Sequence, residues 1–171
     1  MSIPLYGQNK DGDALEKAAN RGFGETVGTA IADAADTITL VKADFGSTFT
    51  AAVTSNAKVL NLPASVTVDD IGKQIKIYVI ANLVGSGTYT INTNTGNTLS
   101  PNSAFCGQAV TVVRPAAVGN TRIVITGAAT NSACGGGSTI LAEVTSAGEY
   151  RVELLLQPLG AGSDAVAVST P

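Results

Sequence analysis

The chain has 171 residues, of which 44% are hydrophobic and only 13% are charged, and its formal net charge is -3. A chain of this length forms one domain, with or without an extended segment, and buries about 70% of its unfolded surface without help from a metal or disulfide. The small negative charge and the lack of any basic cluster exclude the electrostatic footprint of a nucleic-acid or anionic-membrane binder, so we expect neither partner.

The first predicted element is an N-terminal arm, residues 1–36, rich in alanine, glycine and acidic side chains. Residues 14–20 have the composition of a short helix with Asp13 as N-cap, but two turns are too short to be stable without packing. Tyr6 lies in this arm with little local core to join, which makes it a candidate intersubunit anchor. A frayed terminus is the competing interpretation on physical grounds alone.

From residue 37 onward, apolar and polar residues alternate with the period of half-buried β-strands. The predicted strands are 37–40, 48–50, 60–63, 75–79, 89–91, 110–112, 123–125, 140–144 and 150–156, with residues 146–148 forming a hairpin connection. We therefore predict an all-β fold, an antiparallel β-sandwich or barrel-like domain of eight to ten strands over residues 37–159. A flexible C-terminal tail is predicted over residues 160–171.

Two segments of this region, residues 92–103 and 131–138, consist of Asn, Thr, Ser and Gly with little to bury. We expect them to be surface loops at one end of the sandwich. Most aromatic side chains are predicted to lie in the core. No sequence repeat of solenoid length is apparent.

The chain contains no histidine, which removes the Ser-His-Asp and Cys-His nucleophile arrangements. Asp69 and Asp70 form the only adjacent carboxylate pair, but they stand at the entry to a strand, where Asp is an ordinary turn residue. The triplet Asp44-Phe45-Gly46 matches one motif of protein kinases without its companion motifs. We therefore predict that the protein is not an enzyme and uses no cofactor.

The two cysteines, Cys106 and Cys134, fit no zinc-binding spacing, and no metal site is predicted. The opening residues contain no signal or membrane-spanning segment, so we expect synthesis in a cytoplasm. Reduced thiols are the expected state there, and a bridge formed later in an extracellular particle is the alternative.

Two sets of residues carry a resemblance to a known family. Residues 3–10 with 13–15 resemble the opening of small virion proteins of tailed phages, especially phages of cyanobacteria and other marine bacteria, which are regarded as head decoration proteins. Residues 40–49, 60–64, 72–77 and 89–91 are similar to a strand pattern of phage capsid-decorating and fibre-associated β-domains. Together they cover about the first half of the chain.

The resemblance implies a cement protein that binds the major capsid protein on the outside of the head, commonly as a homotrimer, and clamps neighbouring capsid subunits. It places the protein in the virion, on the capsid surface. The expected capsid or subunit contacts are Ile3, Pro4, Leu5 and Tyr6, and the expected arm hinges are Gly22, Gly24 and Gly28. The alternative is a phage fibre or surface adhesion module whose Asn/Thr/Gly loops bind host glycans, although the chain has no tryptophan.

Overall fold

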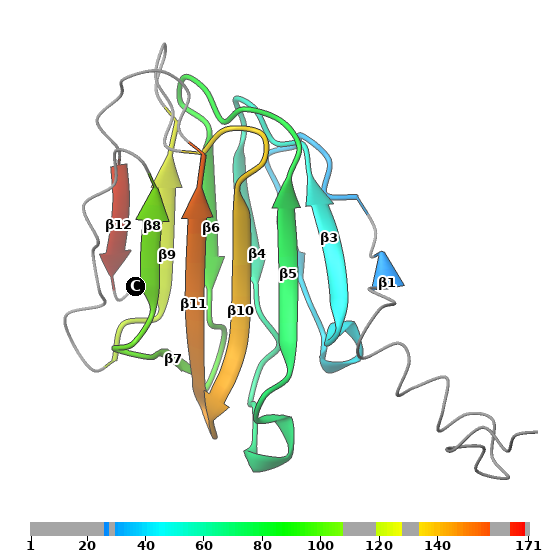
Figure 1. The fold of residues 1–171 in the computed structure, drawn as a ribbon, viewed down its shortest axis with the longest axis vertical. Coiled ribbons are helices and arrows are strands. Elements are labelled where there is room, and N and C mark those ends of the chain that lie inside the picture. The colour runs from blue at the N-terminus through cyan, green and yellow to red at the C-terminus, as the bar shows by residue number, and fades with distance from the viewer. Residues whose placement is uncertain (1–25, 28–29, 108–118, 128–133, 158–164, 170–171) are drawn as a thin grey trace, which may run out of the picture.

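A computed structural model describes residues 26–27, 30–107, 119–127, 134–157 and 165–169, and it shows two β-sheets packed face to face (Figure 1). The predicted all-β, sandwich-like fold is confirmed. The short helix predicted at residues 14–20 and the strand predicted at 110–112 lie outside the described residues. Within the described ranges, no helix has the length and apolar character needed to cross a membrane.

Sheet A has seven strands and sheet B has five. Sheet A runs in the order β1-β3-β5-β10-β11-β7, with β8 also paired to β11. Its strands are β1 (Thr26–Val27), β3 (Ser47–Ala51), β5 (Gln74–Val79), β7 (Thr98–Leu99), β8 (Ala104–Gly107), β10 (Thr139–Ser146) and β11 (Glu149–Leu156). Sheet B runs in the order β12-β9-β6-β4-β2. Its strands are β2 (Thr37–Thr39), β4 (Ala57–Asn61), β6 (Thr88–Asn92), β9 (Arg122–Thr126) and β12 (Ala165–Ser169). The flexible tail predicted over residues 160–171 is therefore wrong for residues 165–169, which pair with β9.

The expectation of an antiparallel sandwich is wrong for the first half of the chain. The chain crosses from β2 in sheet B to β3 in sheet A, and it repeats this crossing from β4 to β5. Consequently β2, β4 and β6 run parallel in sheet B, and β3 runs parallel to β5 in sheet A. The hairpin between β10 and β11 is antiparallel, as predicted. Alternation reports which side of a strand is buried, but it carries no information about strand direction.

Both crossings use the same short turn, a repeat that the sequence did not reveal. The turns are 3-10 helices, η1 (Lys42–Asp44) and η2 (Val68–Asp70). In each, the carboxylate of the last residue accepts a hydrogen bond from the backbone N–H that precedes the turn. The donors are Val41 to Asp44 at 2.7 Å and Thr67 to Asp70 at 3.0 Å. The kinase-like triplet is therefore part of a capped turn, and Gly46, with a φ of 85°, is its left-handed exit.

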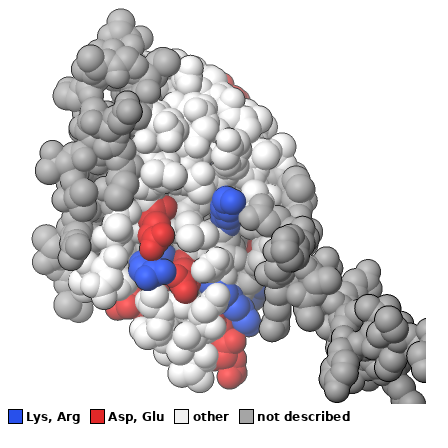
Figure 2. Space-filling view, viewed as in Figure 1, with Lys and Arg blue, Asp and Glu red and all other residues white. Residues whose placement is uncertain are grey.

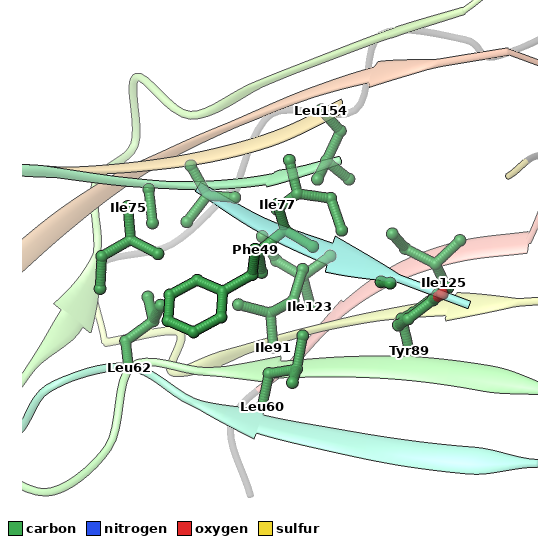
Figure 3. Packing of buried hydrophobic residues seen from close by; sticks show 14 of the residues in the cluster. Phe49, Leu60, Leu62, Ile75, Ile77, Tyr89, Ile91, Ile123, Ile125 and Leu154 are labelled. Atoms are coloured by element: carbon green, nitrogen blue, oxygen red, sulfur yellow. The ribbon is translucent and has the colours of Figure 1, made fainter. Parts of the chain in front are cut away.

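The hydrophobic core lies between the two sheets. Phe49 of β3 points into it and is surrounded by side chains from both sheets (Figure 3). The labelled neighbours are Ile75, Ile77 and Leu154 from sheet A and Leu60, Leu62, Tyr89, Ile91, Ile123 and Ile125 from sheet B. Tyr78 departs from the expectation that aromatic residues are buried, because it points outward from β5 and is 43% exposed.

The segment 92–103 is only in part the surface loop that its composition predicts, since Thr95 and Asn102 are exposed but other polar side chains are not. Thr93, Asn97, Ser100 and Ser103 are all buried. The Asn97 side chain accepts a hydrogen bond from the Val66 N–H at 3.1 Å and donates to the carbonyls of Pro63 and Thr93 at 3.1 and 2.8 Å. Small polar side chains can be buried when their hydrogen bonds are made internally.

The two polar segments also lie at opposite ends of the sandwich. Strand β6 enters residues 92–103 at the end where η1 and η2 lie, whereas residues 134–138 lead into the start of β10 at the other end (Figure 1). The expectation that both segments form one loop cluster is therefore wrong.

Candidate interaction surfaces

The residues described by the structure hold no cluster of three or more His, Cys, Asp or Glu suited to a metal ion. The adjacent carboxylates do not form a catalytic pair either, since Asp70 is buried and Asp69 is exposed. One Asp70 oxygen accepts from Lys42 Nζ at 2.7 Å and the other from Lys73 Nζ at 2.8 Å. These bonds, that to Lys42 first, hold the pKa of Asp70 well below its usual range. A carboxylate held ionised in this way fastens η2 and is a poor proton carrier.

A depression lies between η1 and η2 on the outer side of sheet A. Lys42, Lys73 and Lys76 line it together with Phe45 and other side chains. The Lys73 ammonium lies 5.6 Å from the centre of the Phe45 ring, within cation-π range. Because Asp70 already binds two of these lysines, the depression consists largely of the charge network that joins the two turns.

The outer face of sheet A carries an uncharged patch, which we define as Thr50, Tyr78, Ile80, Thr139 and Leu155. Thr50, Tyr78, Thr139 and Leu155 are direct neighbours in one row across β3, β5, β10 and β11. Ile80 follows Tyr78 by two residues, and it is 55% exposed, with Leu155 54% exposed. Figure 2, which views the molecule from this side, shows a broad area without charge over one half of the face.

The other half of the same face holds charged side chains, and three of these form ion pairs within the sheet. Arg151 of β11 forms ion pairs with Glu143 of β10 and with Glu153 two residues along its own strand. Figure 2 shows the blue and red side chains together toward the end that carries η1 and η2. The uncharged patch and the charged half thus occupy opposite ends of one sheet face.

The outer face of sheet B is almost free of charge. Arg122 is the one charged side chain among the outward-facing residues of β2, β4, β6 and β9. These residues are Thr37, Thr39, Ala57, Val59, Asn61, Thr88, Thr90, Asn92, Arg122, Val124 and Thr126. The amides form a row across the strands, in which Asn92 donates to Asn61 at 3.0 Å and Asn61 donates to Thr39 at 3.2 Å. The outer face of sheet B therefore consists mainly of small and polar side chains with few charges.

The segment before β2 is fastened to the sandwich edge. Ile31 is buried beside Ala51 of β3, and its N–H donates to the Thr50 carbonyl at 2.7 Å. The Asp33 carboxylate accepts hydrogen bonds from the hydroxyl and backbone N–H of Thr54 and from the Asn56 amide. These bonds, the Thr54 hydroxyl first, lower the pKa of Asp33 to about 2. Ile31 therefore packs as part of the sandwich, although the sequence analysis assigned it to the arm.

Two further ionisable side chains are structural. The side chain of Lys58 is buried between the sheets and forms an ion pair with Asp36. Cys134 is a fully buried thiol, and burial raises its pKa to about 11, so it is a poor nucleophile. The side chain of Cys106 lies outside the described residues.

All of the predicted contact and hinge residues also lie outside the described residues. They are Ile3, Pro4, Leu5, Tyr6, Gly22, Gly24 and Gly28. The sequence reasoning missed the uncharged patch of sheet A. Its signal was present in residues 74–80, where the outward positions change from Gln74 and Lys76 to Tyr78 and Ile80. A strand that is apolar on both faces at one end exposes an apolar surface there, and such a surface marks an interaction site.

A scan against protein-family models gives no match to the chain, and searches of curated proteins and of solved structures give no similar protein. The function is therefore argued from the surfaces described above.

Proposed function

We propose that this chain is a structural virion protein, a capsid decoration protein that binds the outside of a phage head and stabilises it. The observation that carries the proposal is the outer face of sheet B, where Arg122 is the one charged side chain among the outward residues of four strands. Covering such a face removes few charges from water, so the desolvation cost is low. Binding through it should depend little on salt.

The partner in this proposal is the major capsid protein, and the chain acts as a homotrimer. Three chains held together engage three capsid subunits at once, so each contact can be weak while the assembly stays attached. The arm residues Ile3, Pro4, Leu5 and Tyr6, which precede β1 in the chain, add a second contact to the capsid or to a neighbouring subunit. The resemblance of residues 3–10 and 13–15 to phage decoration proteins supports the same assignment.

The test is binding of the purified chain to phage heads that lack it. We expect the chain to sediment with the heads at about 50 mM salt and also at about 500 mM salt, at which charge interactions are screened weakly and strongly, respectively. The melting temperature of the heads should rise on binding, because a ligand that binds only the assembled state stabilises it. Failure to sediment at either salt concentration would contradict the proposal.

Variants locate the contact on sheet B. Thr90→Lys places a charge in the middle of the outer face, and we expect it to abolish most of the binding. Ser146→Lys places the same charge at an exposed position in the β10–β11 hairpin, and binding should be unchanged. Equal binding by both variants would remove sheet B from the proposal.

The alternative function is a phage fibre or surface adhesion module that binds host glycans. Its expected binding loops have less support, because four polar side chains of residues 92–103 are buried and the segment lies at the opposite end from residues 134–138. Specific binding on a glycan array, without any binding to phage heads, would favour this alternative.

A further inference from the structure

We propose that the depression between η1 and η2 is the docking site of the chain's own N-terminal arm, and that the Glu25 carboxylate binds the lysines that line it. Glu25 is the residue directly before β1. The contact lies within one chain, so the inference goes beyond the proposed function and does not depend on the capsid as partner.

The strand pairing brings the arm to the rim of the depression. Strand β1 runs parallel to β3, with Thr26 level with Ser47 and Val27 level with Thr48. Both Ser47 and Thr48 line the depression. Paired strands lie about 4.8 Å apart, so the arm joins the sandwich about one strand spacing from the depression. A contact made by Glu25 closes no long loop and therefore costs little chain entropy.

The rim has room for a side chain at Gly46. In the register of β1 and β3, Glu25 precedes Thr26 as Gly46 precedes Ser47. Apart from its chain neighbours, no described residue would have an atom within 4 Å of a Cβ on Gly46. Gly46 itself lines the depression. Its lack of a side chain leaves an opening through which a carboxylate can reach the lysines.

The depression has an excess of positive charge. Lys42, Lys73 and Lys76 line it together with Asp69, and Asp70 binds two of these lysines. Three ammonium groups against two carboxylates leave one positive charge in excess, in a chain whose formal net charge is -3. One carboxylate from the arm balances this set.

The ammonium groups of Lys42 and Lys73 can still donate hydrogen bonds. A lysine has three N–H donors. Each of these two lysines donates to one oxygen of Asp70, and their side chains are 43% and 45% exposed. Asp44 caps η1 and Glu143 is paired with Arg151, so neither of these carboxylates supplies the missing charge.

Glu25 is the arm residue best placed to supply it. It is the one charged side chain between Arg21 and Asp33. The other acidic residues of the arm lie farther from β1 and stand among basic residues. The acidic residues are Asp11, Asp13 and Glu16, and the basic ones are Lys10, Lys17 and Arg21.

Docking of Glu25 also selects among the predicted hinges. Gly28 lies between β1 and Ile31, both of which are paired with the sandwich. Gly22 and Gly24 precede Glu25, so they are the hinges at which the arm turns away from its docking site.

The experiment is carbodiimide coupling of the full chain at low concentration, with the product located by mass spectrometry of its peptides. The reagent joins a carboxylate and an amine that are in contact, without a spacer. We expect Glu25 to be joined to Lys42, Lys73 or Lys76 within a single chain. The yield should fall by about twofold or more at about 500 mM salt, because salt screens an ion pair that is open to solvent.

Glu25→Gln should remove this product, whereas Glu16→Gln, the matched control in the same arm, should leave its yield unchanged. A natural chain in which Glu25 joins no lysine of the depression, or joins Lys10 and Lys17 as readily, overturns the inference. Products that link two chains would assign the depression to the arm of a neighbouring copy and would overturn docking within one chain. Binding to phage heads is measured separately, so this inference can fail while the decoration proposal stands.

Discussion

Asn97 fixes the end of the sandwich at which η1 and η2 lie, because its buried amide joins the connection between β4 and η2 to the connection between β6 and β7. Its oxygen accepts from Val66, and its nitrogen donates to Pro63 and Thr93. The Tyr150 hydroxyl donates to the same Pro63 carbonyl at 2.9 Å, which ties β11 to this network. Composition alone cannot identify such a residue, since Asn is also common in exposed turns.

We expect Asn97→Ala to lower the free energy of unfolding by about 3 kcal/mol or more, since each buried group left without a partner costs about 1–3 kcal/mol. Asn61→Ala is the matched control, because this amide lies on the partly exposed outer face of sheet B. Its loss should cost about 1 kcal/mol or less. Denaturant unfolding measures both values, and an equal cost for the two variants would contradict the structural role of Asn97.

Asp33 makes the stability of the fold depend on acid. The pKa of this carboxyl in the folded chain is about 2, below its ordinary value of 3.8, because Thr54 and Asn56 donate hydrogen bonds to the ionised form. A group with a lowered folded-state pKa stabilises the fold above its unfolded pKa, and this contribution is lost as the pH falls. Stability supplied by Asp33 should therefore be complete above about pH 4 and should disappear toward pH 2.

The check is the melting temperature of the natural chain and of Asp33→Asn at several values between pH 5 and 2, roughly spanning the two pKa values. The difference between the two proteins should shrink as the pH falls. A difference that stays constant over this window would mean that Asp33 has an ordinary pKa in the folded chain.

At the scale of elements, most strands of the β-domain could be predicted from alternation. The segments around β2, β3, β5, β6, β9, β10 and β11 were all expected within a few residues, and so was the hairpin that contains Gly148. Predicted and observed bounds differ more at β4, which begins at Ala57. The prediction missed this start because Lys58 points inward, so the buried positions of the strand are not all apolar. The burial of Lys58 could not be predicted from its own strand, because it depends on the ion pair with Asp36.

The candidate surfaces were less predictable than the strands. Whether an outward residue belongs to a patch depends on its neighbours across the sheet, and these depend on strand order. Tyr78 and Leu155 lie 77 positions apart (155 − 78) and become near neighbours only because β10 lies between β5 and β11. No local pattern carries that information.

Connections between the elements are packed closely enough to exclude a single methyl group at Gly127. A Cβ there would lie 2.9 Å from the backbone nitrogen of Val84 and 3.0 Å from the carbonyl carbon of Leu83. We expect Gly127→Ala to lower the free energy of unfolding by about 1–3 kcal/mol, because backbone must move to admit the methyl group.

The matched control for this substitution is Gly136→Ala. Its nearest neighbour would be the Ile80 carbonyl oxygen at 3.5 Å, an ordinary contact. Its stability should therefore stay within about 0.5 kcal/mol of the natural chain. Thermal or denaturant unfolding of the two variants makes the comparison, and similar losses would show that the close approach at Gly127 relaxes without cost.

At the scale of the whole molecule, the sandwich presents two broad faces with little charge available to partners. Sheet B offers a mainly polar face with few charges, and sheet A offers an uncharged half beside a half that holds the Arg151 ion pairs.

The order of strands also determines when this chain can fold during its synthesis. Between β2 and β6 each strand crosses to the other sheet, so the first strands made have no hairpin partner. Sheet A stays divided until β10 and β11 arrive, because β10 pairs with β5 and β11 pairs with β7 and β8. Such non-local pairing slows folding and leaves unpaired strands exposed in the meantime. The ribosome must therefore deliver nearly all of the domain before any large part of it is protected from aggregation.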